Sequence, residues 1–231
     1  MKNNIKYSSI ELAEFYDKSR TTWQDFYDSE KTILEKFIHP NNSILDLGCA
    51  CGGLGKVLSD KFLATDYWGI DINPHCVGLA KKRHANSIIE CGDILDHKFD
   101  KYTNKFDRVI SFSCSDWNVQ SKEMFQRAWS FVTPGGVFIA SLRLTKGKTI
   151  VDSEISYQTV FGEHAAYCVY NLGDALRLFD NPKTICAVGD VKEIRNNTTC
   201  PYDQLCFSVF AVTKRQSSDI SETVLDLDLP L

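Results

Sequence analysis

Between residues 43 and 142, short apolar runs alternate with segments of helical periodicity. The runs that predict strands are Ser43–Leu47, Asp66–Ile72, Ser87–Cys91, Phe106–Phe112 and Val137–Leu142. Helices are expected between them, at about residues 53–61, 74–85 and 121–132. Strands that alternate with helices form a parallel sheet covered on both faces. The pattern therefore predicts an α/β fold with a doubly wound, mostly parallel sheet.

The flanking segments complete this prediction. Two helices are expected before the first strand, at residues 8–20 and 22–38, and residues 143–171 show no clear period. A short helix at 173–179 and two strands at 184–195 and 205–214 follow; the two strands are expected to form an antiparallel pair at one sheet edge. We expect one domain over residues 1–215. The acidic residues 216–231 are predicted to be a flexible tail.

Composition limits the class of protein. The formal net charge is −4, which argues against a broad nucleic-acid footprint, because phosphate contacts need clustered Lys and Arg. No apolar run approaches the roughly 18–20 residues that span a bilayer, and the start, MKNNIKYSSIELAE, lacks an apolar signal core. The nine cysteines are an odd number scattered along the chain, as expected for reduced thiols. These features predict a cytoplasmic protein without a membrane segment.

The loop after the first expected strand is the first candidate for a ligand site. Its sequence is ILDLGCACGGLG, in which Gly48, Ala50 and Gly52 would let the backbone approach a ligand closely. Ligands of doubly wound sheets bind beyond the carboxyl ends of the strands, where Asp46, Asp71 and Asp93 are all expected. Asp71 is placed to accept the hydroxyls of a ribose, and Asp93 could accept from an exocyclic amine. Three acids would repel phosphates, so a nucleoside site is indicated.

Five segments, in order, resemble motifs of the class I S-adenosylmethionine-dependent methyltransferases. They are the D-L-G-C-A-C-G loop at 46–52, G-I-D at 69–71, C-G-D-I at 91–94, F-D-R-V-I at 106–110 and T-P-G-G-V-F at 133–138. The resemblance implies a Rossmann-like fold of seven strands with an antiparallel C-terminal strand. It also implies S-adenosylmethionine as cofactor and S-adenosylhomocysteine as product. The cofactor contacts implied are Asp46, Gly48, Ala50, Gly52, Asp71, Ile72, Asp93, Ile94 and Ser113.

Ala50 departs from this family's pattern, which usually has glycine there. We expect the loop to tolerate alanine if its φ is negative, since many φ values open to glycine are closed to alanine.

The N-terminal segment Tyr16-Asp17-Lys18-Ser19-Arg20 resembles a Y-D-x-x-x segment that covers the cofactor in related small-molecule enzymes. This resemblance implies that residues 1–40 form a helical lid, with Tyr16 at the methionine end and Arg20 paired with the methionine carboxylate. A surface helix with an Asp17–Arg20 charge pair is the open alternative.

Other functions remain open for the loop. Its letters also spell G-x-A-x-x-G, a variant of the dinucleotide fingerprint, so an NAD(P)-dependent oxidoreductase is one alternative. A catalytically silent protein with the methyltransferase fold is another. A metal clip formed by Cys49 and Cys51 is disfavoured, because structural zinc prefers two to four residues between paired cysteines. We expect these cysteines to be small side chains packed under the loop, and no metal ligand is assigned.

The acceptor is expected to be a small molecule or saccharide, methylated at a hydroxyl or carboxyl group. The segment after the fourth strand, SFSCSDWN, has neither the [DNS]-P-P-[YFW] box of amino methylases nor a Pro-Cys nucleophile. Asp116 could orient or deprotonate the acceptor, or cap the next helix; Trp117 could line the pocket or the core. His164 is the first candidate for a general base. Tyr157, Tyr167 and Tyr170 could line the same pocket. Monomer and homodimer both remain possible.

Overall fold

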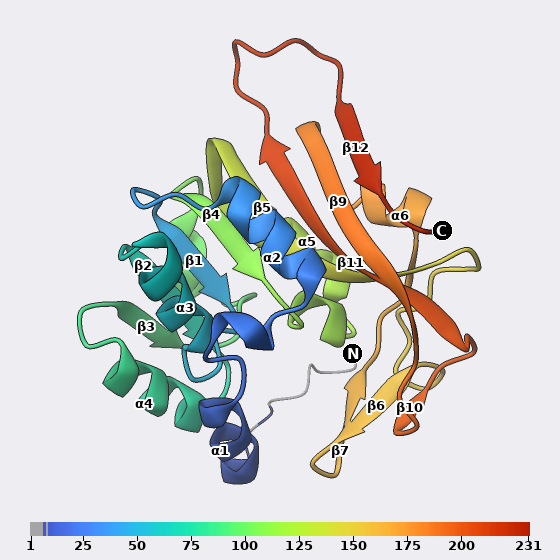
Figure 1. Ribbon diagram of the computed structural model, residues 1–231, viewed down its shortest axis with the longest axis horizontal. Helices are drawn as coiled ribbons and strands as arrows, with labels where there is room; N and C mark the ends of the chain where they lie inside the picture. Colours follow the sequence, from blue (N-terminus) through green and yellow to red (C-terminus); the bar gives the residue numbers. More distant parts are fainter. Residues whose placement is uncertain (1–6, 8) are drawn as a thin grey trace.

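The computed structural model describes residue 7 and residues 9–231, and within them a nine-stranded sheet forms the centre of the molecule (Figure 1). Its order is β12-β9-β11-β5-β4-β1-β2-β3, and β8 also pairs with β5. The strands are β1 (Ile44–Leu47), β2 (Tyr67–Asp71), β3 (Ile88–Cys91), β4 (Phe106–Ser111), β5 (Val132–Thr145), β8 (Tyr170–Asn171), β9 (Pro182–Glu193), β11 (Gln204–Lys214) and β12 (Val224–Asp228).

The pairing confirms the predicted fold class. Strands β1 to β5 are parallel to one another, whereas β11 is antiparallel to both β5 and β9. The order reverses between β1 and β4, which is the switch point where doubly wound sheets bind ligands. The predicted hairpin of two C-terminal strands is present as β9 and β11. The sheet is wider than the seven strands predicted.

Helices cover both faces of the sheet. Helices α2 (Asp28–Phe37), α3 (Gly53–Phe62) and α4 (Pro74–Arg83) bury apolar side chains on one face, and α5 (Ser121–Phe131) covers the other. Successive strand residues point to opposite faces, so Phe138 of β5 packs with Phe125 while its neighbour Ile139 packs with Ile33. This double coverage explains why the parallel strands are apolar on both sides. No described helix is both long and apolar enough to cross a membrane.

The N-terminal region is more broken than predicted. Helix α1 (Ile10–Lys18) begins where the Ser9 hydroxyl accepts the Leu12 N–H at 3.1 Å. The second predicted helix divides into a 3₁₀ turn, η1 (Trp23–Asp25), and α2. The carboxylate of Glu30 accepts the N–H of Tyr27 at 2.9 Å and so closes the first turn of α2. Residues 1–6, and residue 8 at the start of the helix expected over residues 8–20, lie outside the described residues.

The region expected to be unpatterned contains a small second sheet. Strand β6 (Tyr157–Val160) pairs with β7 (Glu163–Ala166) on one side and with β10 (Thr198–Thr199) on the other. No element was expected over residues 143–171, and the helix expected next, at 173–179, is present as α6 (Leu172–Leu176). Strands of two to four residues carry too few side chains for a period-2 pattern to be recognised. This sheet projects from the same end of the molecule as α1, the end toward which β1 and β4 point (Figure 1).

The prediction of a flexible tail is wrong for residues 224–228. They form β12, which adds to β9 in parallel register. Lys36 of α2 forms an ion pair of 2.9 Å with Asp226 of this strand. The alternation Leu225, Asp226, Leu227, Asp228 is a strand pattern, and pairing with an otherwise open sheet edge satisfies its backbone groups.

Candidate functional site

A cavity of about 700 Å³ lies at the carboxyl ends of the parallel strands. Its floor comes from the loops after β1, β2, β3 and β4, and its walls include β5 and β11. Helix α1 and the small sheet of β6, β7 and β10 both contribute lining residues from above the floor. The predicted residues that line it are Tyr16, Arg20, Asp46, Gly48, Ala50, Asp71, Ile72, Asp93, Ile94, Ser113, Asp116, Trp117 and Tyr167.

The loop after β1 turns through left-handed backbone conformations. Gly48 has a φ of +72°, and a Cβ built there would lie 2.6 Å from the Cys114 sulfur. Glycine is therefore required on steric as well as conformational grounds. The N–H of Gly48 donates to the Ile70 carbonyl at 2.8 Å, which joins the loop to β2.

Ala50 also lies in the left-handed region, with a φ of +44°. The condition under which alanine was expected to be tolerated, a negative φ, is not met. The N–H of Ala50 donates to Asp71 Oδ2 at 2.8 Å, and glycine would adopt this turn without strain. The methyl group is tolerated sterically and carries a conformational cost.

The two cysteines beside Ala50 are buried. The Cys49 side chain packs against Gly69 of β2, and the Cys51 thiol donates to the Ala13 carbonyl of α1 at 3.3 Å. They occupy the packing role expected of small side chains beneath the loop.

Asp46 is the most buried of the three strand-end acids, at 3% exposure. Its Oδ2 accepts the Tyr67 hydroxyl at 2.7 Å. Burial raises the pKa of Asp46 to about 7; the Tyr67 hydrogen bond opposes this shift, and the neighbouring charge of Asp71 adds to it. Asp46 can therefore hold a proton near neutral pH, unlike an ordinary carboxyl group.

Asp71 and Asp93 are half-buried at the cavity wall. Asp71 Oδ2 accepts the Ala50 N–H and Oδ1 accepts the Asn73 N–H, each at 2.8 Å. Asp93 Oδ1 accepts the Leu95 N–H at 2.9 Å. A carboxylate oxygen has a second lone pair, so both groups are fixed in place and still able to accept from a ligand. This is the arrangement that hydroxyls of a ribose and an adenine amine require, and the residues present fit the nucleoside part of the implied cofactor.

Arg20 lines the cavity but already has a partner. Its guanidinium forms an ion pair of 2.9 Å with Glu30, whose side chain is 2% exposed, and it lies 4.3 Å from the Phe26 ring centre. The alternative pair of Asp17 with Arg20 is not formed, because Asp17 pairs with Arg83 at 3.0 Å. A guanidinium has five donors, so the Glu30 pair leaves N–H groups for a ligand carboxylate. Tyr16 lines the same wall, where burial raises the pKa of its hydroxyl to about 12.

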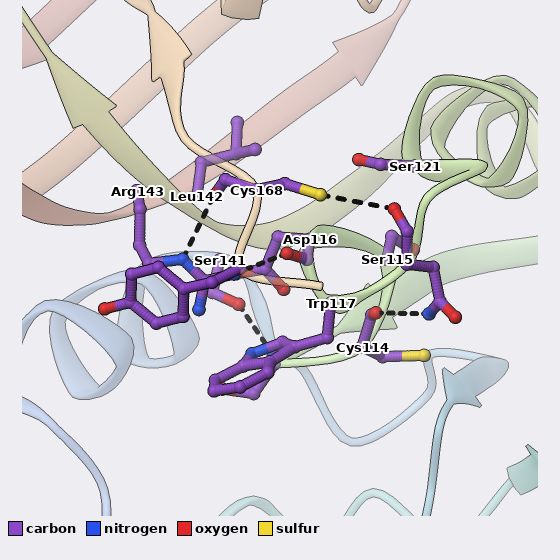
Figure 2. A network of polar contacts seen from close by, with 12 residues as sticks. Cys114, Ser115, Asp116, Trp117, Ser121, Ser141, Leu142, Arg143 and Cys168 are labelled. Carbon is purple, nitrogen blue, oxygen red and sulfur yellow. Dashed lines mark hydrogen bonds and ion pairs between the residues drawn. The ribbon is translucent and has the colours of Figure 1, made fainter. Parts of the chain in front are cut away.

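At the other end of the cavity, Asp116 forms a buried ion pair with Arg143 (Figure 2). Asp116 and Trp117 belong to a 3₁₀ turn, η3 (Ser115–Trp117), and Arg143 comes from β5. Arg143 Nη2 lies 3.2 Å from Asp116 Oδ2, its Nε donates to the Cys168 carbonyl at 3.1 Å, and its Cζ lies 3.8 Å from the Tyr167 ring centre. The pair is thus held on several sides. Asp116 does not cap α5, so that alternative is wrong.

One oxygen of Asp116 has no partner within the described residues. Asp116 is 2% exposed, and its Oδ1 has no hydrogen bond. The buried indole N–H of Trp117 also lacks an acceptor. Burial raises the pKa of Asp116 while Arg143 opposes that shift. Buried polar atoms normally have partners, so an unpaired acceptor and donor at a cavity wall indicate a place for a polar ligand.

Four predicted residues do not line the cavity. His164 is exposed on β7 and stacks on Tyr157, with ring centres 4.5 Å apart. Tyr170 is a core residue whose hydroxyl is hydrogen-bonded to Ser121 at 2.5 Å. Gly52 shapes the start of α3 with a φ of +77°, and its carbonyl accepts from His84 Nε2 at 2.7 Å. His164, Tyr157 and Tyr170 thus do not line the cavity to which they were assigned: β6 and β7 place Tyr157 and His164 outside it, and Tyr170 of β8 lies in the core.

Sequence reasoning missed Glu30, Arg143 and Arg195. Arg143 carried a usable signal, since a charged residue inside the apolar run VFIASLRL must find a buried partner. Glu30 is the third residue of a helix, and a glutamate at this position is predicted only to cap the helix N-terminus. Arg195 follows β9 in a polar turn, and nothing in the sequence places that turn beside the cavity.

Comparison with known proteins agrees with this architecture. Residues 44–136 match the family model described as a methyltransferase domain. The chain is 25% identical over 175 residues to malonyl-[acyl-carrier protein] O-methyltransferase 2 of Ilyobacter polytropus (71% of this chain, 62% of that protein). It is 26% identical over 138 residues to phosphoethanolamine N-methyltransferase 2 of Caenorhabditis elegans (58% of this chain, 30% of that protein). The matches thus span less than two thirds of these relatives' length.

Solved structures share the fold. An S-adenosylmethionine-dependent methyltransferase of Methanosarcina mazei superposes with a TM-score of 0.60 at 15% identity, covering 83% of this chain and 99% of that one. The match to a methyltransferase domain decides between the two cofactor families that the loop alone left open. Residues 44–136 of the chain thus match a methyltransferase domain, and the fold is the one that S-adenosylmethionine-dependent methyltransferases adopt.

Proposed function

We propose that this protein transfers the methyl group of S-adenosylmethionine to a hydroxyl group of a small-molecule acceptor. The observation that carries the proposal is the unpartnered Oδ1 of Asp116, a buried carboxylate oxygen at the cavity wall. A hydroxyl must be oriented and relieved of its proton as it is methylated, and a carboxylate within reach can do both.

The strand-end acids support the cofactor part of this proposal. Asp71 is held by two backbone N–H groups at the tip of β2, where it can accept ribose hydroxyls, and Asp93 lies on the neighbouring loop. Tyr16 and Arg20 close the wall from the N-terminal side. The bound cofactor would supply a methyl group already activated by the positive sulfonium, so the protein's task is alignment and exclusion of water.

Asp116 favours a hydroxyl over a carboxyl group as the methylated atom. A carboxylate placed against Asp116 Oδ1 would meet a like charge in a buried setting, whereas a hydroxyl donates to it. Arg143 holds Asp116 in place and offsets part of its charge. Curated relatives are named as O- and N-methyltransferases, so the family leaves the acceptor atom open.

Two variants test the proposal separately. In calorimetry with S-adenosylhomocysteine, Asp71→Asn should weaken binding by about 1–3 kcal/mol through lost charge-assisted hydrogen bonds. Asp66→Asn is the matched control. Asp66 lies just before the first residue of β2, at the end of the strand away from Asp71, and its carboxylate accepts from the Trp68 indole at 2.9 Å. Unchanged affinity of Asp71→Asn contradicts the ribose assignment.

Asp116→Asn should abolish methylation in a screen of hydroxylated acceptors with radiolabelled S-adenosylmethionine. Its affinity for S-adenosylhomocysteine should stay at the wild-type value. The wild-type rate should rise with pH through the raised pKa of Asp116, because only the ionised form takes a proton. Full turnover by Asp116→Asn would remove it as the proton acceptor.

A further inference from the structure

The three arginines that line the cavity differ in their partners. Arg20 is paired with Glu30 and Arg143 with Asp116, at 2.9 and 3.2 Å. Arg195 has no carboxylate partner among the described residues, and none of them accepts a hydrogen bond from its side chain. No lysine of the described chain lines the cavity. The acceptor end thus has one cation whose charge is not offset by the protein.

Arg195 is held at the cavity by a fixed turn. The Thr198 N–H donates to the Arg195 carbonyl at 2.9 Å, which closes the turn into β10. Asn197 connects this turn to β6 through two hydrogen bonds. Its Oδ1 accepts from Gln158 Nε2 at 2.8 Å, and its carbonyl accepts the Thr159 N–H at 3.2 Å. Gln158 is 6% exposed, so the exposed Asn197 is anchored on a buried side chain. The arginine therefore starts from a defined position at the cavity, although its side chain is exposed.

Two further hydrogen-bond donors at the same end have no partner in the part of the chain that the structure describes. They are the buried indole N–H of Trp117 and the buried hydroxyl of Thr198, both of which belong to cavity-lining residues. The Trp117 and Tyr167 rings meet edge to face at 5.3 Å. Trp117 and Ile194, the residue before Arg195, pack against the same cluster of buried side chains, which contains Tyr167. Burial raises the pKa of Tyr167 to about 12; the charges of Arg143 and Arg195 oppose that shift, and the charge of Asp116 adds to it. One cation and two unpartnered donors thus belong to residues that line this end of the cavity.

The three strand-end acids lie at the other end, and Asp116, the acid beside Trp117, is paired with Arg143. Asp46, Asp71 and Asp93 follow β1, β2 and β3, whereas Arg195 follows β9 and Trp117 follows β4, on the other side of the switch point. A ligand with one anionic group would therefore bind in one orientation, with that group away from the strand-end acids. An arginine suits this task because its planar fork matches both carboxylate and phosphate oxygens.

We propose that Arg195, Thr198 and Trp117 form an anion subsite, so that the acceptor is a hydroxylated molecule carrying a carboxylate or phosphate. This inference rests on the proposed function, because it places the anion at Arg195 and the hydroxyl at Asp116. Carboxylate and phosphate share the recognition chemistry, and the two are distinguished by experiment.

The test uses three probes that differ only in one group: 3-hydroxybenzoate, 3-hydroxyphenyl phosphate and the neutral 3-hydroxybenzamide. Each is titrated calorimetrically into the full chain, with and without saturating S-adenosylhomocysteine. At least one anionic probe should bind ~10-fold or more tightly than the amide, the size of a charge-assisted hydrogen bond. The tighter of the two anions identifies the group. Arg195→Gln should remove this preference and leave S-adenosylhomocysteine affinity unchanged.

Arg177→Gln is the matched control, because Arg177 is 74% exposed outside the cavity and pairs with Asp174. It should retain the preference. The anion subsite is overturned if the wild type binds the three probes equally or binds none of them. It is also overturned if Arg195→Gln keeps the preference for an anionic probe. Failure of S-adenosylhomocysteine to bind would instead overturn the proposed function, while the preference among the probes would still be measured without it.

Discussion

Replacing Ala50 by glycine should stabilise the protein or leave its stability unchanged. Ala50 has a φ of +44°, where an L-residue with a Cβ costs about 1–2 kcal/mol relative to glycine. Glycine adds freedom to the unfolded chain, which costs about 0.4–1 kcal/mol. The difference predicts a net stabilisation of roughly 0–1.5 kcal/mol, and a chain of this size then gains up to about 2–6 °C in Tm.

Urea denaturation and thermal unfolding of Ala50→Gly measure this directly. The matched control is Ala85→Gly, at a turn position before β3 that does not share the positive φ. There glycine relieves no strain, and the substitution should cost about 0.4–1 kcal/mol through the unfolded state alone. The two alanine-to-glycine changes should therefore differ in sign.

The same variant tests whether the strain serves binding. The Ala50 N–H donates to Asp71, so the turn that glycine adopts freely keeps that bond. S-adenosylhomocysteine should bind Ala50→Gly at least as tightly as the wild type. If Ala50→Gly is destabilised as much as Ala85→Gly, the left-handed conformation carries no cost and the reasoning from φ is refuted.

Three other changes test separate parts of the structure. Burial raises the pKa of Asp46 to about 7, so the folded state binds this proton more tightly than the unfolded state does. The protonated carboxyl group therefore contributes to the free energy of unfolding at low pH, and this contribution is lost as pH rises from about 4 through 7. In urea denaturation across this range, Asp46→Asn should remove up to roughly 4 kcal/mol of that decline, and a pH profile parallel to the wild type would contradict the shift. Arg143→Gln leaves Asp116 buried without its counter-charge and should lower the unfolding free energy by about 3–5 kcal/mol; a loss below about 1 kcal/mol would show that the pair is not buried in solution. His164→Ala should leave both turnover and S-adenosylhomocysteine affinity unchanged, because His164 is exposed outside the cavity, and a drop in the methylation rate would reinstate it as a base.

Local patterns were sufficient for the parallel part of the fold and for the strand-end acids. Each strand–loop–helix unit contains its own signals: an apolar run, a small-residue turn and a helix start. The carboxyl ends of parallel strands meet at one edge of the sheet, so Asp46, Asp71 and Asp93 could be placed together from their position in those units alone. Gly48 directly follows β1 and lines the cavity, whereas Gly52 lies at the start of α3 and does not line it.

The acceptor end depended on contacts between distant segments. Asp116 and Arg143 are 27 residues apart, and Arg195 follows the end of β5 by fifty residues; only the paired strands bring them to one cavity. His164 and Tyr157 were misplaced because the pairing of β6 with β7 and β10 decides where those side chains point. Likewise, Ala50 has its positive φ in a folded loop whose N–H binds Asp71, and β12 is a strand because β9 offers an open edge. The sequence alone thus determined the strand-end half of the cavity, whose geometry is local to each unit, while the half around Asp116 and Arg195 was decided by tertiary pairing, which no single segment encodes.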